Sequence, residues 1–204
     1  NKMRIAVENL TVGYNNKPVL SKANFSLEEN MLVALIGGNG SGKSTLLKTL
    51  LSEIPVIEGK ITPFTEGEIA FLPQEIEDPP FITVSQVLEI GCRRGAFQVK
   101  TNEIMATCEI QDLAERKFSE LSGGEKKRVW LAFALLQNTE VIFLDEPFSA
   151  IDYDSRDDFY NLLHGFCVNG RSILVVSHDI NLVFKHADKI LEIKDGNIKE
   201  VPKH

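Results

Sequence analysis

Residues Gly37–Thr45, with the sequence GGNGSGKST, have the composition of a phosphate-binding site. They contain Gly37-x-x-x-x-Gly42-Lys43-Ser44, the pattern of a phosphate-binding loop. Glycines allow backbone N–H groups to point inward around phosphate oxygens without Cβ clashes. We expect Lys43 to reach the β- and γ-phosphates and the Ser44 hydroxyl to bind Mg²⁺. The alternative is a glycine-rich turn that only connects two elements. It is disfavoured because an apolar run precedes the loop and a helical pattern follows it.

The sequence VIFLDEP, residues Val141–Pro147, is a second candidate for chemistry. Its apolar run ends in two adjacent carboxylates, Asp145 and Glu146. A carboxylate at the end of a buried strand suits Mg²⁺, directly or through a water. On an extended chain Glu146 points away from Asp145, so we expect a different role for it, as general base for an attacking water. An acidic strand end at the surface is the alternative, and a phosphate-binding loop in the same chain argues against it.

The sequence LSGGEKKR, residues Leu121–Arg128, is a third candidate. Ser122 lies three residues before Glu125, which is the spacing of a capping box at a helix N-terminus. A capped, glycine-rich helix start also attracts anions through its free N–H groups and the helix dipole. We therefore expect a structural cap that also serves as a second phosphate-recognising helix start.

The elements that must position these motifs alternate between strands and helices. Buried strands, apolar throughout, are expected at residues 31–36, 141–144, 173–176 and 190–193. Helical patterns are expected at residues 44–51, 154–166 and 181–186. This alternation predicts an α/β fold with a parallel sheet covered on both faces. Shorter strands are expected at residues 5–12, 24–27, 59–61 and 68–72.

The stretch from residue 75 to about residue 138 has a different character, because it contains no buried-strand run. Helical patterns are expected there at residues 84–91, 102–109 and 124–136. We therefore predict one domain of 204 residues in which two separated parts build the α/β core and the part between them is a helical insertion. The predicted core comprises residues 1–75 and 138–204, and the predicted helical subdomain comprises residues 76–137.

Composition excludes several other classes of protein. A formal net charge of −7 argues against a dedicated nucleic-acid binder, so no nucleic acid is expected as a partner. No Cys-x-x-Cys pair is present, which disfavours zinc and thioredoxin-like redox sites, and we expect Cys92, Cys108 and Cys167 to be small buried hydrophobes. No apolar run approaches the ~18 residues of a membrane span, and the stretch around Met3 lacks the apolar core of a signal peptide.

The ordered set of motifs resembles the ATP-binding-cassette (ABC) ATPases along nearly the whole chain, from Val7 to about Ile198. LSGGEKKR looks like the signature motif of that family, and it lies between the phosphate-binding loop and the sequences FLDEP and VVSHD. The resemblance implies a P-loop NTPase core with a parallel sheet. It also implies a small antiparallel β subdomain on the N-terminal side and a helical insertion that carries the signature.

The resemblance also implies roles for individual residues. Tyr14 matches the aromatic residue that stacks on adenine, Gln74 matches the glutamine that reaches Mg²⁺ and the attacking water, and His178 matches the histidine at the γ-phosphate. Glu146, His178 and Gln74 would be catalytic, and Mg²⁺ would be held by Ser44, Gln74 and Asp145. ATP would be bound by Tyr14, Gly37, Gly38, Asn39, Gly40, Ser41, Gly42, Lys43, Ser44, Thr45, Ser122, Gly123, Gly124 and Asp152. His164, His186 and His204 match no motif and are expected at the surface.

The resemblance implies a working unit larger than one chain. Two cassettes, in a homodimer or a cassette heterodimer, would face head to tail with two ATP molecules between them. The unit would bind transmembrane permease subunits through roughly residues 75–94, peripherally at the cytoplasmic face of the inner or plasma membrane. The segment after Gln74 is most similar to importers of metal ions, siderophores, haem or cobalamin. A small exporter, a lipid or haem-assembly transporter and a soluble iron–sulfur assembly ATPase are the alternatives.

Overall fold

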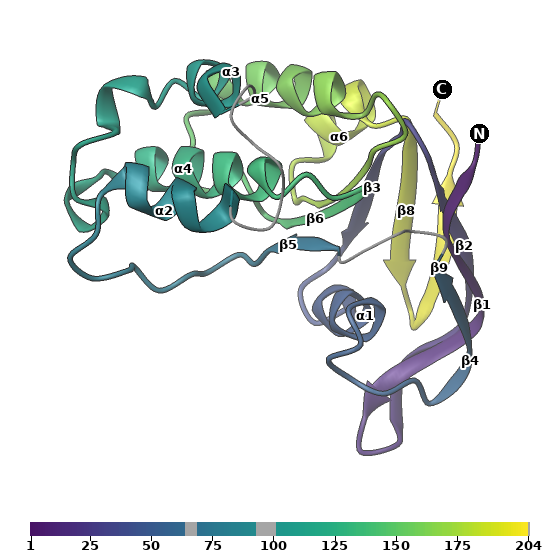
Figure 1. The fold of residues 1–204 in the computed structure, drawn as a ribbon. Helices are drawn as coiled ribbons and strands as arrows, with labels where there is room; N and C mark the ends of the chain where they lie inside the picture. The colour runs from purple at the N-terminus through teal and green to yellow at the C-terminus, as the bar shows by residue number, and fades with distance from the viewer. Residues whose placement is uncertain (64–68, 93–100, 204) are drawn as a thin grey trace.

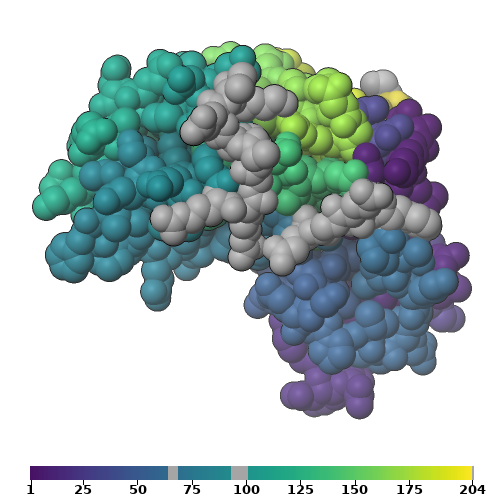
Figure 2. Space-filling model, in the orientation of Figure 1, coloured from purple at the N-terminus to yellow at the C-terminus, as the bar shows by residue number. Residues whose placement is uncertain are grey.

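The computed structural model describes residues 1–63, 69–92 and 101–203 of the chain. Two sheets and a group of helices make up this part of the molecule (Figure 1). The helices α2, α3 and α4 gather at one end of the molecule, and the strands β1, β2 and β4 lie at the other end. The surface is hollowed between the teal residues that follow β5 and the blue residues around α1 (Figure 2).

The core sheet has six strands in the order β5-β6-β7-β3-β8-β9. Neighbouring strands from β5 to β8 pair in parallel, and β9 pairs antiparallel with β8. Parallel neighbours place their carboxyl ends at one edge, where ligands of open α/β sheets bind. The strand bounds are β3 Leu32–Gly37, β5 Ala70–Leu72, β6 Val141–Asp145, β7 Ser172–Val176, β8 Lys189–Lys194 and β9 Asn197–Val201.

A smaller antiparallel sheet has the order β2-β1-β4. Its three strands are β1 Met3–Tyr14, β2 Lys17–Glu28 and β4 Glu58–Pro63. Alternating residues of β1, such as Ile5 and Val7, are buried because this sheet packs one face onto the core. The long hairpin β1–β2 thereby brings the residues near its turn toward the start of α1.

The helices are inserted between the strands of the core sheet. Helix α1 follows β3, α5 lies between β6 and β7, and α6 lies between β7 and β8. The stretch between β5 and β6 contains α2, α3, two short 3₁₀ turns and α4. The helix bounds are α1 Lys43–Leu50, α2 Val84–Cys92, α3 Thr101–Thr107, α4 Gly123–Leu136, α5 Tyr153–Phe166 and α6 Ile180–His186.

Both faces of the core sheet are buried along β3, β6 and β7, which explains why these three strands are mostly apolar. On β6, Ile142 and Leu144 pack into the hydrophobic cluster that includes α4 and α5. The intervening Val141 and Phe143 pack into the cluster that includes α1 and the small sheet. Successive side chains of a strand point to opposite faces, so each face receives every second residue. The predicted parallel, doubly covered sheet is confirmed.

Several details differ from the expectations. Strands β1 and β2 extend well beyond residues 5–12 and 24–27, and β9 was not expected. His186 is not a surface residue, because its side chain is 8% exposed and its ring stacks on Tyr160 with centroids 4.8 Å apart. His204 and the start of the strand expected at 68–72 lie outside the described residues. The division into residues 1–75, 76–137 and 138–204 stays a prediction.

The expectation of buried cysteines is confirmed for two of the three. Cys108 and Cys167 are buried and all three cysteines are free, although Cys92 is only half-buried. None of the helices in the described ranges has the length and apolarity that crossing a membrane requires.

Candidate functional site

A cavity of about 210 Å³ opens at the carboxyl edge of the core sheet. It lies where β3, β6 and β7 end, and the loops after these strands supply most of its walls. The topology therefore brings together motifs that lie more than a hundred residues apart in the chain. The residues that line the cavity are Val19, Asn39, Gly40, Ser41, Gly42, Lys43, Ser44, Thr45, Gln74, Asp145, Glu146, Val176 and His178.

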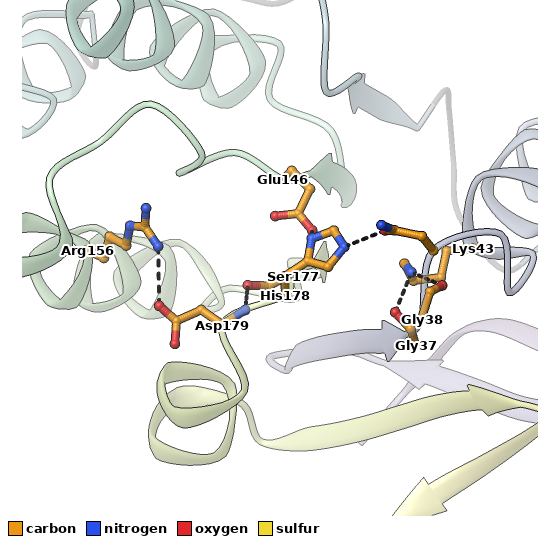
Figure 3. A network of polar contacts seen from close by, with 9 residues as sticks. Gly37, Gly38, Lys43, Glu146, Arg156, Ser177, His178 and Asp179 are labelled. Atoms are coloured by element: carbon orange, nitrogen blue, oxygen red, sulfur yellow. Dashed lines mark hydrogen bonds and ion pairs between the residues drawn. The ribbon is translucent and has the colours of Figure 1, made fainter.

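The phosphate-binding loop forms one wall of this cavity. Gly42 has φ 105°, a left-handed conformation that favours glycine, and α1 begins at the next residue. The first N–H groups of a helix have no intrahelical partner, so the start of α1 offers donors to an anion. The Lys43 ammonium donates to the carbonyl oxygens of Gly37 at 2.5 Å and Gly38 at 2.8 Å (Figure 3). These bonds hold a cation over the loop.

Asp145 and Glu146 line the same cavity, which corrects the expectation that they point in opposite directions. The reason lies in the backbone. Strand β6 ends at Asp145, and Glu146 has φ 47°, so the chain is no longer extended there. A left-handed non-glycine residue costs about 1 kcal/mol or more. The Glu146 N–H donates to the Val176 carbonyl at 2.9 Å, a bond that holds this conformation.

His178 follows β7 and lines the same cavity at the carboxyl edge of the sheet. Its Nδ1 contacts Oε1 of Glu146, and its Nε2 lies 3.1 Å from Oδ1 of Asn39 in the phosphate-binding loop. Figure 3 shows the ring between the carboxylate and the loop. The Asp179 N–H donates to Ser177 Oγ at 3.1 Å, and the Asp179 carboxylate accepts from the Leu182 N–H at the start of α6. These bonds fix the backbone on either side of His178.

Burial shifts the pKa values of the charged side chains in the site. It raises the pKa of Asp145 and of Glu146, and in Glu146 the adjacent Asp145 charge adds to the increase while His178 opposes it. Burial also lowers the pKa of Lys43, against the attraction of both carboxylates. The two acids therefore lie in a place where an additional cation would be stabilised. A carboxylate with a raised pKa also suits proton transfer near neutral pH.

Three oxygen donors that suit Mg²⁺ line the cavity. They are the Ser44 hydroxyl, the Gln74 amide and the Asp145 carboxylate. Mg²⁺ prefers such hard oxygen ligands. Within the described ranges, three or more His, Cys, Asp or Glu side chains nowhere gather as a metal site would require. The residues present fit a magnesium ion carried in with a phosphate ligand.

The signature residues lie in a different cavity, of about 300 Å³. Ser122 caps α4, accepting from the Glu125 N–H at 3.2 Å, while the Ser122 N–H donates to the Glu125 carboxylate at 2.9 Å. The predicted capping box is confirmed. Ser122, Gly124 and Asp152 line this second cavity, and a Cβ on Gly124 would lie 3.1 Å from the carbonyl of Ala150. The role of this second cavity in phosphate recognition stays a prediction.

Two residues near the first cavity were not expected from the sequence. Val19, on β2, lines the cavity, whereas Tyr14 ends β1 half-exposed and is not among the lining residues. The adenine role of Tyr14 stays a prediction. Lys127 donates to the Gln74 carbonyl at 2.6 Å, and burial lowers its pKa against the attraction of Asp145 and Glu146. In the sequence, EKKR is only part of the signature motif, and nothing in it indicates the contact between Lys127 and Gln74.

Comparison with known proteins adds relatives to this geometry. The family model described as ABC transporter matches residues 20–149. The chain is 37% identical over 199 residues to the zinc import ATP-binding protein ZnuC of Hydrogenovibrio crunogenus, covering 92% of this chain and 77% of that protein. It is 33% identical over 204 residues to the manganese transport system ATP-binding protein MntB of Bacillus subtilis, covering 92% and 82%.

Solved structures show the same architecture. A metal-chelate type ABC transporter captured in an inward-facing conformation superposes with a TM-score of 0.85 at 28% sequence identity. The match covers 99% of this chain and 84% of that chain. The predicted core with its parallel sheet, antiparallel β sheet and helical insertion is therefore the architecture of a known group of cassettes.

Proposed function

Because this chain belongs to the ABC transporter family and is an ATP-hydrolysing subunit of such a transporter, we propose that its ATPase drives import of a divalent metal ion or a metal chelate. The observation that carries the catalytic part is the shared cavity of the phosphate-binding loop, Asp145, Glu146 and His178. The metal cargo is supported by the relatives, whose names assign zinc and manganese to them.

We assign the steps of hydrolysis to residues of the first cavity. The phosphate-binding loop and Lys43 would hold the β- and γ-phosphates, and Ser44, Gln74 and Asp145 would hold Mg²⁺. When bound, Mg²⁺ neutralises phosphate charge that would otherwise oppose attack. Glu146 would accept the proton of the attacking water. His178 would orient the Glu146 carboxylate and donate toward the γ-phosphate.

The working unit in this proposal is a head-to-tail dimer. Each chain would supply the phosphate-binding loop of one site and, through Ser122, Gly123 and Gly124, the signature of the other. The placement of the signature in its own cavity supports this, because within one chain Ser122 does not line the first cavity. Asp152, beside the signature in the second cavity, would lie at the same interface. The homodimeric or heterodimeric composition stays open to measurement.

The permease would bind on the hollow surface between the helical insertion and the core (Figure 2). On one side, Phe81 is 89% exposed in the segment after β5, and Ile90 of α2 is half-exposed. On the other side lies a cavity of about 690 Å³ whose apolar walls include Ile54, Val56 and Phe71. Exposed apolar side chains flanking a hollow are typical of a protein interface. A cytoplasmic helix of a permease would place the chain at the cytoplasmic face of the membrane.

Two experiments test this function. The Glu146→Gln chain, tagged and expressed in its source cell, is captured in Mg-ATP from gently solubilised membranes, and copurifying chains are identified by mass spectrometry. A polytopic partner is expected, and purely soluble partners under every detergent condition would overturn the transporter role. Separately, cells lacking the gene are analysed for zinc, manganese and iron. Their metal content should fall and be restored by the wild-type chain but not by Glu146→Gln.

A further inference from the structure

Helix α4 carries residues of interest at two places along its length. Its N-terminal cap is Ser122, with Gly123 and Gly124 in the first turn. Five residues after the cap, Lys127 points to a different part of the molecule, the segment of residues 73–83 that follows β5. This 73–83 segment carries Gln74 and has no helix or strand of its own apart from one isolated bridge at Thr83. Apart from backbone bonds near its end, such as that of the Phe118 N–H to the Ile82 carbonyl, side-chain contacts hold this segment in place.

Two neighbouring lysines of α4 provide such contacts. Lys127 Nζ donates to the backbone carbonyl of Gln74 at 2.6 Å, across 53 residues of sequence. Lys126 Nζ lies 2.5 Å from Oδ2 of Asp78, four residues further along the same segment. The Lys127–Gln74 bond lies next to the first cavity, because Gln74 lines that cavity together with Asp145.

We propose that Lys127 is a positioning residue that couples the two ATP sites. The inference rests on the proposed dimer. When ATP phosphates occupy the first cavity, a resulting shift of the Gln74 backbone would be passed to α4 through the Lys127–Gln74 hydrogen bond. The capped start of α4 is rigidly joined to Lys127 within the same helix, so Ser122 is reoriented toward the second chain's nucleotide. One chain's bound ATP thereby prepares its signature for the other site.

Trp130 allows this coupling to be measured within one chain. It is the only tryptophan in the sequence, and it lies on α4 three residues after Lys127. Its ring packs between Phe118, with centroids 5.0 Å apart, and Phe133, at 5.5 Å. A movement of α4 against these rings changes the surroundings of the indole. Fluorescence of Trp130 is therefore a direct readout of the position of α4.

The experiment uses the Glu146→Gln chain, in which we expect ATP hydrolysis to be at least about a hundredfold slower, at a concentration where light scattering shows a monomer. Mg-ATP is added to saturation, and bound ATP is measured in parallel by equilibrium dialysis. Trp130 fluorescence should shift with ATP and shift less with ADP. Adding Lys127→Met should remove the shift at saturating ATP, and Lys127→Arg should retain it. The matched control is Lys185→Met, which removes a surface lysine paired with Asp157 on the core.

Gln74→Ala gives an independent test because it leaves α4 untouched. It should also remove the ATP-induced shift, and Lys127→Met should then have no further effect on the ATP concentration needed for dimerisation. Alone, Lys127→Met should raise that concentration about tenfold. Two outcomes overturn the coupling: a full Trp130 shift in Lys127→Met, or additive effects of the two substitutions on dimerisation. A chain that fails to bind ATP in dialysis would instead overturn the ATP-site assignment itself.

Discussion

Glu146 and His178 are in contact at the carboxyl edge of the core sheet, carboxylate Oε1 against imidazole Nδ1. The opposite ring nitrogen of His178 lies 3.1 Å from Asn39 in the phosphate-binding loop. The candidate base is therefore connected to the loop through a single ring. Glu146 also has a backbone conformation that few side chains adopt, with φ 47°. Together these contacts hold the carboxylate in one orientation, as a group that activates a water molecule requires.

Glu146→Gln should abolish most ATP hydrolysis while ATP binding remains. The amide keeps the shape of the carboxylate but cannot accept a proton, and a general base contributes about 10²–10⁴-fold to a rate. We therefore expect a loss of at least about a hundredfold in kcat. Because ATP is not consumed, the chain should accumulate as a dimer in Mg-ATP, measured by size-exclusion chromatography with light scattering.

Glu115→Gln is the matched control for this substitution. Glu115 is an exposed glutamate in the helical insertion, and its side chain makes no hydrogen bond or ion pair with the residues that the structure describes, so its loss should leave both hydrolysis and oligomeric state unchanged. A Glu146→Gln chain that remained monomeric in Mg-ATP would contradict the composite site. Hydrolysis at the wild-type rate would show that Glu146 is not the base.

The pH dependence of hydrolysis should report the environment of Glu146. Burial raises the pKa of this carboxyl, with a further contribution from Asp145, so the base is protonated at a higher pH than an ordinary glutamate. Activity should then fall as the pH drops through this raised pKa. His178 lowers the pKa of Glu146, and His178→Ala should therefore move the acid limb of kcat to still higher pH. If the acid limb of kcat in His178→Ala stayed at the same pH or moved to lower pH, His178 would not be the group that lowers the pKa of the catalytic carboxylate.

Lys43→Ala should weaken ATP binding. The Lys43 ammonium lies over the loop, held by two backbone carbonyls, and a hydrogen bond to a charged group is worth about 1.5–3 kcal/mol. The dissociation constant should therefore rise by roughly tenfold to a hundredfold, measured by calorimetric titration. Lys48→Ala, an exposed lysine of the same helix, is the control and should bind ATP normally. If the two variants bound ATP with equal affinity, Lys43 would not contribute to phosphate binding.

Local sequence patterns predicted the parts of this fold whose causes are local. The loop at Gly37–Thr45 was predictable because its glycines, the apolar strand before it and the helix after it are all adjacent. The capping box at Ser122 depends on a residue three positions away. The edge strand Asn197–Val201 was not predictable, because most of its side chains are exposed and it has no buried apolar face.

Long-range contacts explain the remaining differences. His186 looks like a surface histidine in its own helix, yet it is covered by Tyr160 and pairs with Asp157 from α5. Lys127 looks like one charge in a basic run, yet it reaches a carbonyl on another element. The direction of the Glu146 side chain depends on one left-handed backbone angle that is stabilised by a bond to Val176. None of these has a signal within a short window of sequence.

Mixing two inactive chains should restore hydrolysis if each site is built from two chains. Lys43→Ala disables the phosphate-binding loop of its own chain, and Ser122→Arg disables the signature, which lies in a separate cavity. In a head-to-tail dimer of the two variants, one site has both defects and the other has none. An equal mixture should therefore recover up to about a quarter of wild-type activity per chain. Two Lys43→Ala chains mixed together should recover nothing. The contrary outcome is a variant pair that recovers no activity while still forming mixed dimers in Mg-ATP. Each ATP site would then either belong to a single chain or work only when the other site is also intact. In both cases the independent composite sites argued from the two cavities would be wrong.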